Sequence, residues 1–311
     1  MRAITQDRLG PADVLHLTET ARPVPGPTEV LVRVRAAGVN PVDRATRESG
    51  GLGTLGAPPF TVGWDVSGVV EETGIGVTRF APGDDVYGMP WFPRQAAAYA
   101  EYVTAPSRHF APKPVSLSHV EAAGLPLAGL TAWQTLVDTA GLRPGQRVLV
   151  TAAAGGVGHL AVQIAAARGA YVLGTARAAN HAFLRSLGVS EPIDYTAVDV
   201  ADAVRDVDVV LDLAGDDPAR LVRTLRLGGV LVPVPEGLDD VTTRAAAEAG
   251  VRAVDFLVEP DHAGLAELSA LVDAGRLAVT VAATYPLGEA ARAHEHGATG
   301  RTRGKIVLTV D

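Results

Sequence analysis

The pattern of apolar and polar residues changes at about residue 125. Before this point, short apolar runs such as 30–34, 66–70 and 100–103 are separated by turns rich in proline and glycine, which is typical of an irregular β-rich domain. After it, apolar strands alternate with segments of helical periodicity, which indicates a parallel sheet with crossover helices. We therefore predict an α/β chain whose β-rich part precedes a parallel sheet.

The second part contains six predicted strands, the number found in a complete dinucleotide-binding sheet. They lie at 147–152, 170–175, 192–195, 207–213, 229–234 and 251–258. Helical patterns such as 159–168 and 178–187 lie between them. The predicted elements that follow are a helix at 263–273, a strand at 279–283, a helix at 287–296 and a strand at 305–310. Because six strands already complete the nucleotide sheet, we expect these last elements to return to the first domain.

The composition narrows the chemistry. The 311 residues include no cysteine, which excludes disulfides, iron–sulfur clusters, thiol nucleophiles and every zinc site that needs a thiolate. The net charge is −8 and the lysines are Lys113 and Lys305 alone, so no polybasic stretch is present to bind nucleic acid or an anionic membrane surface. We expect neither as a partner.

Further patterns argue against a membrane span, a targeting sequence and a metal site. The uncharged run 148–167 is as long as a bilayer span, but its glycines and polar residues indicate a buried strand, loop and helix. Arg2, Gln6 and Asp7 precede any apolar run, so we expect no signal sequence and a cytoplasmic protein. The eight histidines do not stand with acids at metal-ligand spacing, so we expect no metal and mostly solvated histidines. The acidic pairs 84–85, 216–217 and 239–240 predict turns and helix starts.

The segment 148–158, VLVTAAAGGVG, has the pattern of a nucleotide-binding loop. Ala153, Gly155 and Gly158 have the spacing of GxGxxG with alanine in the first place. Small residues let the backbone approach a pyrophosphate, and the helix that begins near Val157 directs its free N–H groups and positive dipole end at the phosphates. The alternative is that the glycines only allow the helix to pack on the sheet.

The end of the second predicted strand bears on the choice between NADH and NADPH. An NAD enzyme places Asp or Glu there to accept from the adenosine ribose, whereas this chain continues Gly174, Thr175, Ala176, Arg177. No acid is present to repel a 2′-phosphate, and Arg177 is available to bind one. This favours NADPH as the cofactor, although Arg177 would also suit an ordinary solvated position at the start of a helix.

With these residues placed, the chain resembles the medium-chain dehydrogenase/reductase superfamily, and within it the zinc-free quinone oxidoreductase (zeta-crystallin-like) branch. The resemblance runs nearly from end to end and includes the nucleotide loop. Its other motifs are 39–43 (VNPVD), 63–68 (GWDVSG), 80–88 (FAPGDDVYG), 98–103 (AYAEYV), 124–136 (GLPLAGLTAWQTL) and 300–307 (GRTRGKIV). It implies a GroES-like catalytic domain formed by 1–124 and 262–311, an inserted Rossmann NADPH-binding domain at 125–261, and a homodimer.

The resemblance also shows what this chain lacks. Zinc-dependent relatives have a cysteine in the place of Asn40 and a His-Glu pair in the places of Trp64 and Asp65, and they carry a four-cysteine lobe after the region of Tyr87. Because these ligands are missing, we predict no catalytic or structural zinc and exclude a zinc alcohol dehydrogenase. Many family members also carry a tyrosine shortly after the VNPVD-type motif, where this chain has Arg44, Ala45, Thr46 and Arg47.

The family's cofactor contacts transfer to matching residues. The resemblance implies that Asn40 and Thr131 lie near the nicotinamide. The predicted cofactor-binding residues are Ala153, Gly155, Gly156, Val157, Gly158, Thr175, Arg177, Tyr195 and Arg301. Tyr195 and Arg301 match residues that contact the adenosine 2′-phosphate in the family. The alternatives are that Tyr195 covers a strand end and that Arg301 is a surface charge.

Aromatic residues are the predicted substrate contacts. Trp91 and Phe92 stand where family members shape the mouth of the cleft, which suggests a flat, apolar substrate, although they would equally suit the domain's own core. Trp64 is also a predicted substrate contact. Phe256 would line the cleft or belong to the strand that forms the family's usual dimer edge.

These residues predict an NADPH-dependent, zinc-independent oxidoreductase that transfers hydride to a quinone or an α,β-unsaturated carbonyl. The amide of Asn40, the hydroxyl of Thr131 or a water would stabilise the negative charge that forms on the substrate oxygen, and solvent would then supply a proton. One alternative is a dedicated double-bond (enoyl-type) reductase that acts on one biosynthetic intermediate. Another is a redox-inert NADPH-binding protein with a structural or sensory role.

Overall fold

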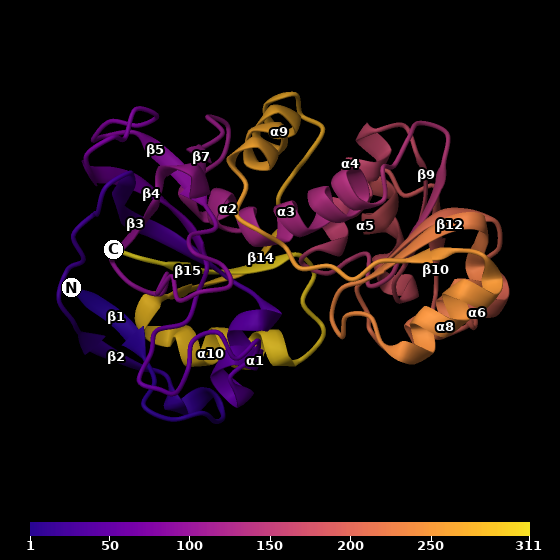
Figure 1. Cartoon of the computed structure of the whole chain (residues 1–311), viewed down its shortest axis with the longest axis horizontal. Coiled ribbons are helices and arrows are strands. Elements are labelled where there is room, and N and C mark those ends of the chain that lie inside the picture. Colours follow the sequence, from indigo (N-terminus) through magenta and orange to yellow (C-terminus); the bar gives the residue numbers. More distant parts are fainter. The chain divides into compact units, whose positions relative to one another are not determined.

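The computed structural model describes all 311 residues, which form two compact units. Unit 1 consists of Met1–Leu130, Glu259–Gly275 and Val279–Asp311. Unit 2 consists of Thr131–Val258 and Arg276–Ala278. Unit 1 therefore contains both ends of the chain, which are marked in Figure 1.

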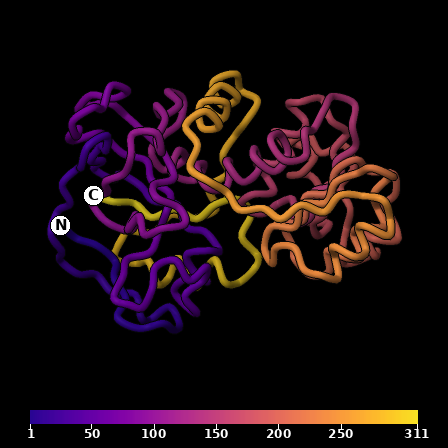
Figure 2. The backbone as a smooth tube through the Cα atoms, viewed as in Figure 1, coloured from indigo at the N-terminus to yellow at the C-terminus, as the bar shows by residue number.

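Unit 1 is built on a seven-stranded sheet. The strand order is β14-β15-β3-β4-β5-β7, and β6 also pairs with β3. Its strands are β3 (Glu29–Val39), β4 (Asp65–Thr73), β5 (Asp85–Gly88), β6 (Tyr102–Pro106), β7 (Phe110–Pro112), β14 (Val281–Pro286) and β15 (Lys305–Thr309). The last strand, β15, pairs antiparallel with β3, so the yellow end of the chain runs among the indigo and purple segments in Figure 2. A separate antiparallel pair joins β1 (Arg2–Thr5) to β2 (His16–Glu19).

The helices of unit 1 are mostly short. They are α1 (Pro41–Ser49), α2 (His119–Ala123), α9 (His262–Asp273) and α10 (Ala290–Ala298), with 3₁₀ turns at Ala12–Val14, Ser107–His109 and Leu287–Glu289. Ser118 begins α2 because its hydroxyl accepts the N–H of Glu121, whose carboxylate accepts the N–H of Ser118 in return. Tyr87 on β5 holds α9 by donating its hydroxyl to the carbonyl of Leu265 at 2.6 Å.

Unit 2 contains a six-stranded parallel sheet, which confirms the predicted doubly wound α/β class. The strand order is β10-β9-β8-β11-β12-β13, the arrangement of a dinucleotide-binding fold. Its strands are β8 (Arg147–Val150), β9 (Tyr171–Thr175), β10 (Glu191–Ile193), β11 (Val207–Asp212), β12 (Leu225–Pro233) and β13 (Arg252–Ala253). Val148, Leu149 and Val150 on the central strand β8 are buried, as a parallel strand covered on both faces requires.

Helices connect the strands of unit 2. They are α4 (Gly158–Ala167), α5 (His181–Ser186), α6 (Val200–Ala203), α7 (Pro218–Leu221) and α8 (Asp240–Ala249), with 3₁₀ turns at Ala178–Asn180 and Val222–Thr224. Before β8, α3 (Pro126–Trp133) continues into a π-helix at Gln134–Thr139. The carboxylates of Asp217 and Asp239 accept backbone N–H groups at the starts of α7 and α8, which confirms the helix starts predicted from those acidic pairs.

Some predicted elements differ in extent from those observed. The strand predicted at 251–258 forms only at Arg252–Ala253, because β13 pairs with β12 alone, at the edge of the sheet, and this pairing covers two residues. The helix predicted at 178–187 is divided into the 3₁₀ turn Ala178–Asn180 and α5. The strand predicted at 279–283 begins two residues later, as β14.

Candidate active site

The predicted nucleotide loop forms a tight turn between β8 and α4. The backbone of Ala152 has a positive φ of 46°, a conformation that alanine seldom adopts. Two hydrogen bonds to Thr175 hold this turn: the Ala152 N–H donates to the Thr175 hydroxyl at 3.1 Å, and the Ala153 N–H donates to the Thr175 carbonyl at 2.9 Å. Thr175, predicted as a cofactor contact, therefore also supports the loop from the neighbouring strand.

Close backbone contacts explain why Gly158 is a glycine. A Cβ atom on Gly158 would lie 2.4 Å from the carbonyl oxygen of Ala152 and 2.7 Å from the Cα of Ala153. Gly174 on β9 is restricted in the same way, since its Cβ would lie 3.0 Å from the Cβ of Ala153. The first turn of α4 is thereby held against the end of β8.

The N-terminus of α4 leaves backbone donors free. The N–H groups of Gly156, Val157 and Gly158 donate no backbone hydrogen bond, whereas the next N–H, that of His159, donates to the carbonyl of Gly155 at 3.0 Å. The buried imidazole of His159 also lies against this carbonyl, with its Nδ1 2.9 Å from the oxygen. Three free donors beside the positive end of a helix dipole can bind a phosphate.

Arg177 and Tyr195 lie side by side after the ends of β9 and β10. The Arg177 Nε donates to the Tyr195 hydroxyl at 3.2 Å, both side chains are exposed, and the guanidinium has no carboxylate partner. The nearby carboxylate of Asp194 already accepts from the N–H and hydroxyl of Thr196 and from the N–H of Ala178. These hydrogen bonds, those from Thr196 foremost, lower the pKa of Asp194. The pair thus presents a free cation and a hydroxyl to solvent.

Asn40 lies at the end of β3 and begins α1 in unit 1. Its backbone N–H donates to Asp43 Oδ2 at 2.7 Å, and the same oxygen accepts from the Tyr99 hydroxyl at 3.0 Å. The chain of hydrogen bonds continues from Tyr99 to His294 at 3.1 Å and from His294 to Arg47 at 3.2 Å. All five residues are buried.

The side chain of Asn40 lies between a carboxylate and an ammonium group. Its Nδ2 donates to Asp65 Oδ2 at 2.8 Å, and its Oδ1 accepts from the Nζ of Lys305. Lys305 and Asp65 are themselves a buried ion pair with a separation of 3.5 Å. The other oxygen of Asp65 accepts the N–H of Leu127 at 2.7 Å.

Burial changes the pKa of several groups in these networks, among them Asp43, Asp65 and His294. It raises the pKa of Asp43 from 3.8 to about 7, although the hydrogen bond from Asn40 opposes the change. It also raises the pKa of Asp65, against the opposing charge of Lys305 and the hydrogen bond from Asn40. Burial, with the charges of Arg47 and Arg44, lowers the pKa of His294 to about 3. We conclude that His294 is neutral, so its Nδ1 accepts from Arg47 and its Nε2–H donates to Tyr99.

Three further predicted site residues are Thr131, Arg301 and Phe256. Thr131 is buried at the start of unit 2 and its carbonyl accepts the hydroxyl of Thr135 at 2.6 Å. Arg301 is exposed in unit 1 and its N–H donates to the Thr299 hydroxyl at 3.3 Å. Phe256 is half-buried and follows β13.

Three of the four predicted aromatic substrate residues, Trp64, Trp91 and Phe92, lie in unit 1. Trp64 is buried and its ring meets the ring of Phe92 edge to face, with a centroid separation of 5.4 Å. The indole N–H of Trp64 donates to the carbonyl of Arg94 at 2.6 Å. Trp91 is partly exposed, and its indole N–H donates to the carbonyl of Thr104 at 2.7 Å. This packing corresponds to the alternative raised for Trp91 and Phe92, and their contact with substrate stays a prediction.

The residue patterns missed two features of this region. Lys305 was not predicted to join Asn40, although its rarity as one of two lysines and its place in the 300–307 motif were signals. The expectation of solvated histidines is wrong for His159 and His294, which are buried, whereas the other six histidines are exposed or half-buried. The partners of His294, Tyr99 and Arg47, are distant in the chain, so local periodicity does not indicate them. His159 lies in the uncharged run 148–167, whose predicted burial was the available signal.

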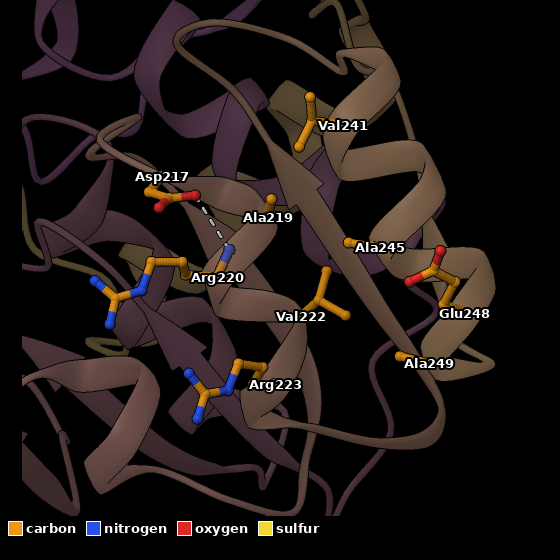
Figure 3. A pocket seen from close by; sticks show the side chains of 9 residues that line it. All are labelled: Asp217, Ala219, Arg220, Val222, Arg223, Val241, Ala245, Glu248 and Ala249. Carbon is orange, nitrogen blue, oxygen red and sulfur yellow. Dashed lines mark hydrogen bonds between the residues drawn. The ribbon is translucent and has the colours of Figure 1, made fainter.

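A hollow of about 600 Å³ opens on unit 2, away from the predicted residues (Figure 3). Side chains from α7, the following 3₁₀ turn and α8 line it, including Arg220, Arg223 and Glu248. None of the predicted site residues belongs to its lining.

None of the helices combines the length and the apolar character that a membrane span requires. No three or more histidine and acidic side chains are grouped so that they would hold a metal ion.

Comparison with known proteins identifies the family. Residues 26–115 match the model of the alcohol dehydrogenase GroES-like domain, which confirms that part of the predicted fold, and residues 187–308 match the model of a zinc-binding dehydrogenase. The chain is 35% identical to a 2-haloacrylate reductase of Burkholderia sp over an alignment 335 residues long with its gaps. The alignment covers 99% of this chain and 98% of the relative.

Two solved structures agree with this result. The quinone oxidoreductase from Coxiella burnetii is 38% identical, with a TM-score of 0.94 and coverage of 100% of this chain and 99% of that one. The Escherichia coli quinone oxidoreductase complexed with NADPH is 27% identical, with a TM-score of 0.88 and coverage of 100% of both chains. The chain belongs to the medium-chain dehydrogenase/reductase superfamily, in its quinone oxidoreductase branch.

Proposed function

We propose that this chain, an NAD(P)H-dependent oxidoreductase of the quinone oxidoreductase type, uses NADPH to reduce an α,β-unsaturated carbonyl or a quinone. The observation that carries the proposal is the hydrogen bonding of the Asn40 side-chain amide. Its amide is held by Asp65 and Lys305, and its second Nδ2–H has no acceptor within the protein. The names of the similar proteins, a 2-haloacrylate reductase and two quinone oxidoreductases, support the same two substrate classes.

The residues of unit 2 fit the phosphates of NADPH. The free N–H groups of Gly156, Val157 and Gly158 would bind the pyrophosphate at the start of α4. Arg177 and Tyr195 would bind the 2′-phosphate, because the guanidinium is exposed and has no carboxylate partner. Arg301 is proposed as a further contact from unit 1, and the similar structure with bound NADPH supports this choice of cofactor.

Bound NADPH supplies a hydride ion to the substrate. An enone would accept the hydride at its β-carbon, where a C–H bond forms. The C=C π electrons shift to join the α-carbon to the carbonyl carbon, and the carbonyl π electrons move onto the oxygen, which gives an enolate. Water then gives a proton to the α-carbon, so the product is the saturated carbonyl compound. A quinone accepts the same hydride, which carries both electrons of the reduction, and one proton from water completes the hydroquinone.

The protein residues act on the oxygen that becomes negative. We propose that the free Nδ2–H of Asn40 donates to this oxygen and stabilises the enolate or hydroquinone anion. The hydroxyl of Thr131 is proposed as a second donor. The aromatic residues Trp64, Trp91, Phe92 and Phe256 are proposed to contact the apolar body of the substrate.

Labelled cofactor tests the reaction. NADPH that carries deuterium in the transferable position is incubated with a panel of enones, enals, acrylates and quinones. We expect deuterium at the β-carbon of a reduced enone, located by mass spectrometry and NMR, or a hydroquinone product. The absence of both across the panel refutes the proposal. Tight NADPH binding in the same samples would then indicate the redox-inert alternative.

The Arg177 assignment has its own test. Arg177→Gln removes a cation that would bind the 2′-phosphate, and a charge-assisted hydrogen bond is worth about 1.5–3 kcal/mol. We expect NADPH binding to weaken by roughly 10- to 100-fold while NADH binding stays constant. Arg185→Gln, at an exposed arginine on α5, is the matched control. Equal weakening of both cofactors contradicts the assignment.

The resemblance to the family also supports a homodimer as a proposal. Sedimentation velocity tests it over a range of protein concentrations. A single species of about 64 kDa, twice the 32.1 kDa of the chain, is expected, and a monomer at all concentrations contradicts it.

A further inference from the structure

Lys305 has an unusual environment for a lysine. Its side chain is 3% exposed and the carboxylate of Asp65 is fully buried. The two residues begin the strands on either side of β3: Lys305 begins β15, Asp65 begins β4, and Asn40 follows the last residue of β3 between them. Gly38 provides the space, since a Cβ there would lie 2.7 Å from Asp65 Oδ2. The fold therefore brings an ammonium and a carboxylate to opposite ends of one amide.

The charges of this pair determine which way the Asn40 amide points. Lys305 can only donate hydrogen bonds, so it must face the carbonyl oxygen of Asn40. An ionised Asp65 can only accept, so it must face Nδ2. Turning the amide by 180° would bring the NH₂ group against the ammonium and the oxygen against the carboxylate. Both contacts would be repulsive and buried, so a single orientation is stable.

The same contacts make the remaining N–H a stronger donor. An ammonium on an amide oxygen draws electron density from nitrogen to oxygen, because the amide group is conjugated. The Nδ2 hydrogens then carry more positive charge, and hydrogen bonds that share an amide strengthen one another. One of these hydrogens is bound to Asp65, and the other has no acceptor in the protein. The backbone N–H of Asn40 is fixed separately, by Asp43 at 2.7 Å.

We propose that Lys305 is a positioning residue for reduction, whose ammonium orients and polarises the Asn40 amide so that its free N–H stabilises the negative oxygen of the substrate. Asp65 contributes to this positioning by accepting the other N–H of the Asn40 amide. The inference deepens the proposed function and rests on the donor role of Asn40. It assigns to one buried cation an effect that acts through Asn40 and not on the substrate directly.

A double-mutant cycle tests the kinetic part. Asn40→Ala removes the donor, and loss of such a donor lowers kcat by about 100-fold. Lys305→Met removes the ammonium, and we expect roughly a tenfold lower kcat, with the KM for substrate and the Kd for NADPH within about threefold of wild type. In the Asn40→Ala background, Lys305→Met should cause no further loss. Independent, multiplying losses overturn the proposal, because Lys305 would then not act through Asn40.

The chain offers matched controls. Lys113 is the only other lysine, and it donates to the carbonyls of Pro114 and Leu117 and not to Asn40. Lys113→Met should leave kcat unchanged. Lys305→Met leaves Asp65 without its cation, so circular dichroism checks its folding. If that variant does not fold, Lys305→Gln replaces it, since glutamine keeps a donor for the Asn40 oxygen without the charge, and the same absence of further loss in the Asn40→Ala background is expected.

An NMR measurement tests the contact without turnover. The chain contains two asparagines, Asn40 and Asn180, so selective ¹⁵N-asparagine labelling gives two side-chain NH₂ signals, which Asn40→Ala assigns. We expect Lys305→Met, or Lys305→Gln in its place, to shift the Asn40 signal and speed its hydrogen exchange while the Asn180 signal stays in place. Lys113→Met should move neither signal.

The two measurements separate the inference from the function on which it rests. An unmoved Asn40 signal in the Lys305 variant overturns the positioning by Lys305, whatever the rates are. A shifted signal, together with an Asn40→Ala variant that keeps the wild-type kcat, overturns instead the donor role of Asn40. A shifted signal with non-additive losses in kcat supports both.

Discussion

Asp43 provides the sharpest prediction for stability, because it is a buried carboxyl group without a cation beside it. One oxygen, Oδ2, accepts the N–H of Asn40 and the hydroxyl of Tyr99, whereas Oδ1 is buried and has no hydrogen-bond partner. Asp43→Asn keeps an oxygen for the two donors and places an NH₂ group where the protonated carboxyl carries its hydroxyl. The variant therefore has the size and charge of the protonated acid at every pH.

The magnitude follows from the pKa of Asp43, which burial raises from 3.8 to about 7. Below pH 3.8 the carboxyl is protonated in the folded and unfolded states. Between the two pKa values the folded state keeps a proton that the unfolded state releases, so wild-type stability is lost as the pH rises through about 7. At about 1.4 kcal/mol per pH unit, the loss is about 4 kcal/mol. Asn does not titrate, so the variant avoids this loss.

The assay is urea denaturation of wild type and Asp43→Asn from pH 4 to pH 8, followed by tryptophan fluorescence. Two of the three tryptophans, Trp64 and Trp91, lie in the same unit as Asp43. We expect similar free energies of unfolding at pH 4 and a variant more stable by about 4 kcal/mol at pH 8. Asp216→Asn, at an exposed position, controls for the loss of a carboxyl. A difference that is constant with pH, or that falls, refutes the reasoning.

Three further changes test the loop and the core. Gly158→Ala puts a Cβ 2.4 Å from the Ala152 oxygen, so we expect NADPH binding, measured by thermal shift, to weaken by about tenfold or more, and an unchanged shift contradicts the steric account. Thr175→Val removes the acceptor of the Ala152 N–H, and denaturation should show a loss of about 1–3 kcal/mol. Tyr87→Phe removes the donor to the Leu265 carbonyl and should cost about 1–3 kcal/mol, whereas an equal denaturation midpoint would show that this bond contributes nothing.

The sequence predicted those parts of the fold that short-range periodicity encodes. Strands β8 to β12 appear near their predicted places because each is an apolar run bounded by turns. The edge strand was overestimated, since the run 251–258 has the same local composition, but a strand extends only as far as its partner pairs with it. β12 pairs with β13 at two residues only, Val230 with Arg252 and Leu231 with Ala253. Pairing length is a property of the sheet and not of the run.

The candidate site divides in the same way. The nucleotide loop could be predicted because Ala153 to Gly158 lie together in the sequence and their spacing is characteristic of this turn. The network around Asn40 could not, because its partner Lys305 is 265 positions away. Only the order β15-β3-β4 brings the two residues and Asp65 together. His294 illustrates the same point, since its contact with Arg47 spans 247 positions.

The family resemblance places Asn40, Trp64 and Asp65 where zinc-dependent relatives carry ligands, and in this structure the three residues have different chemical roles. Trp64 has become part of the apolar packing, with its ring against Phe92 and its N–H bound to a backbone carbonyl. Asn40 and Asp65 have kept polar roles, and a buried carboxylate at Asp65 still requires positive charge nearby. Lys305 supplies that charge from the chain itself. Because the ammonium is attached to a strand of the same sheet, its position is set by folding, and the Asn40 amide receives a fixed cation with no ion to bind.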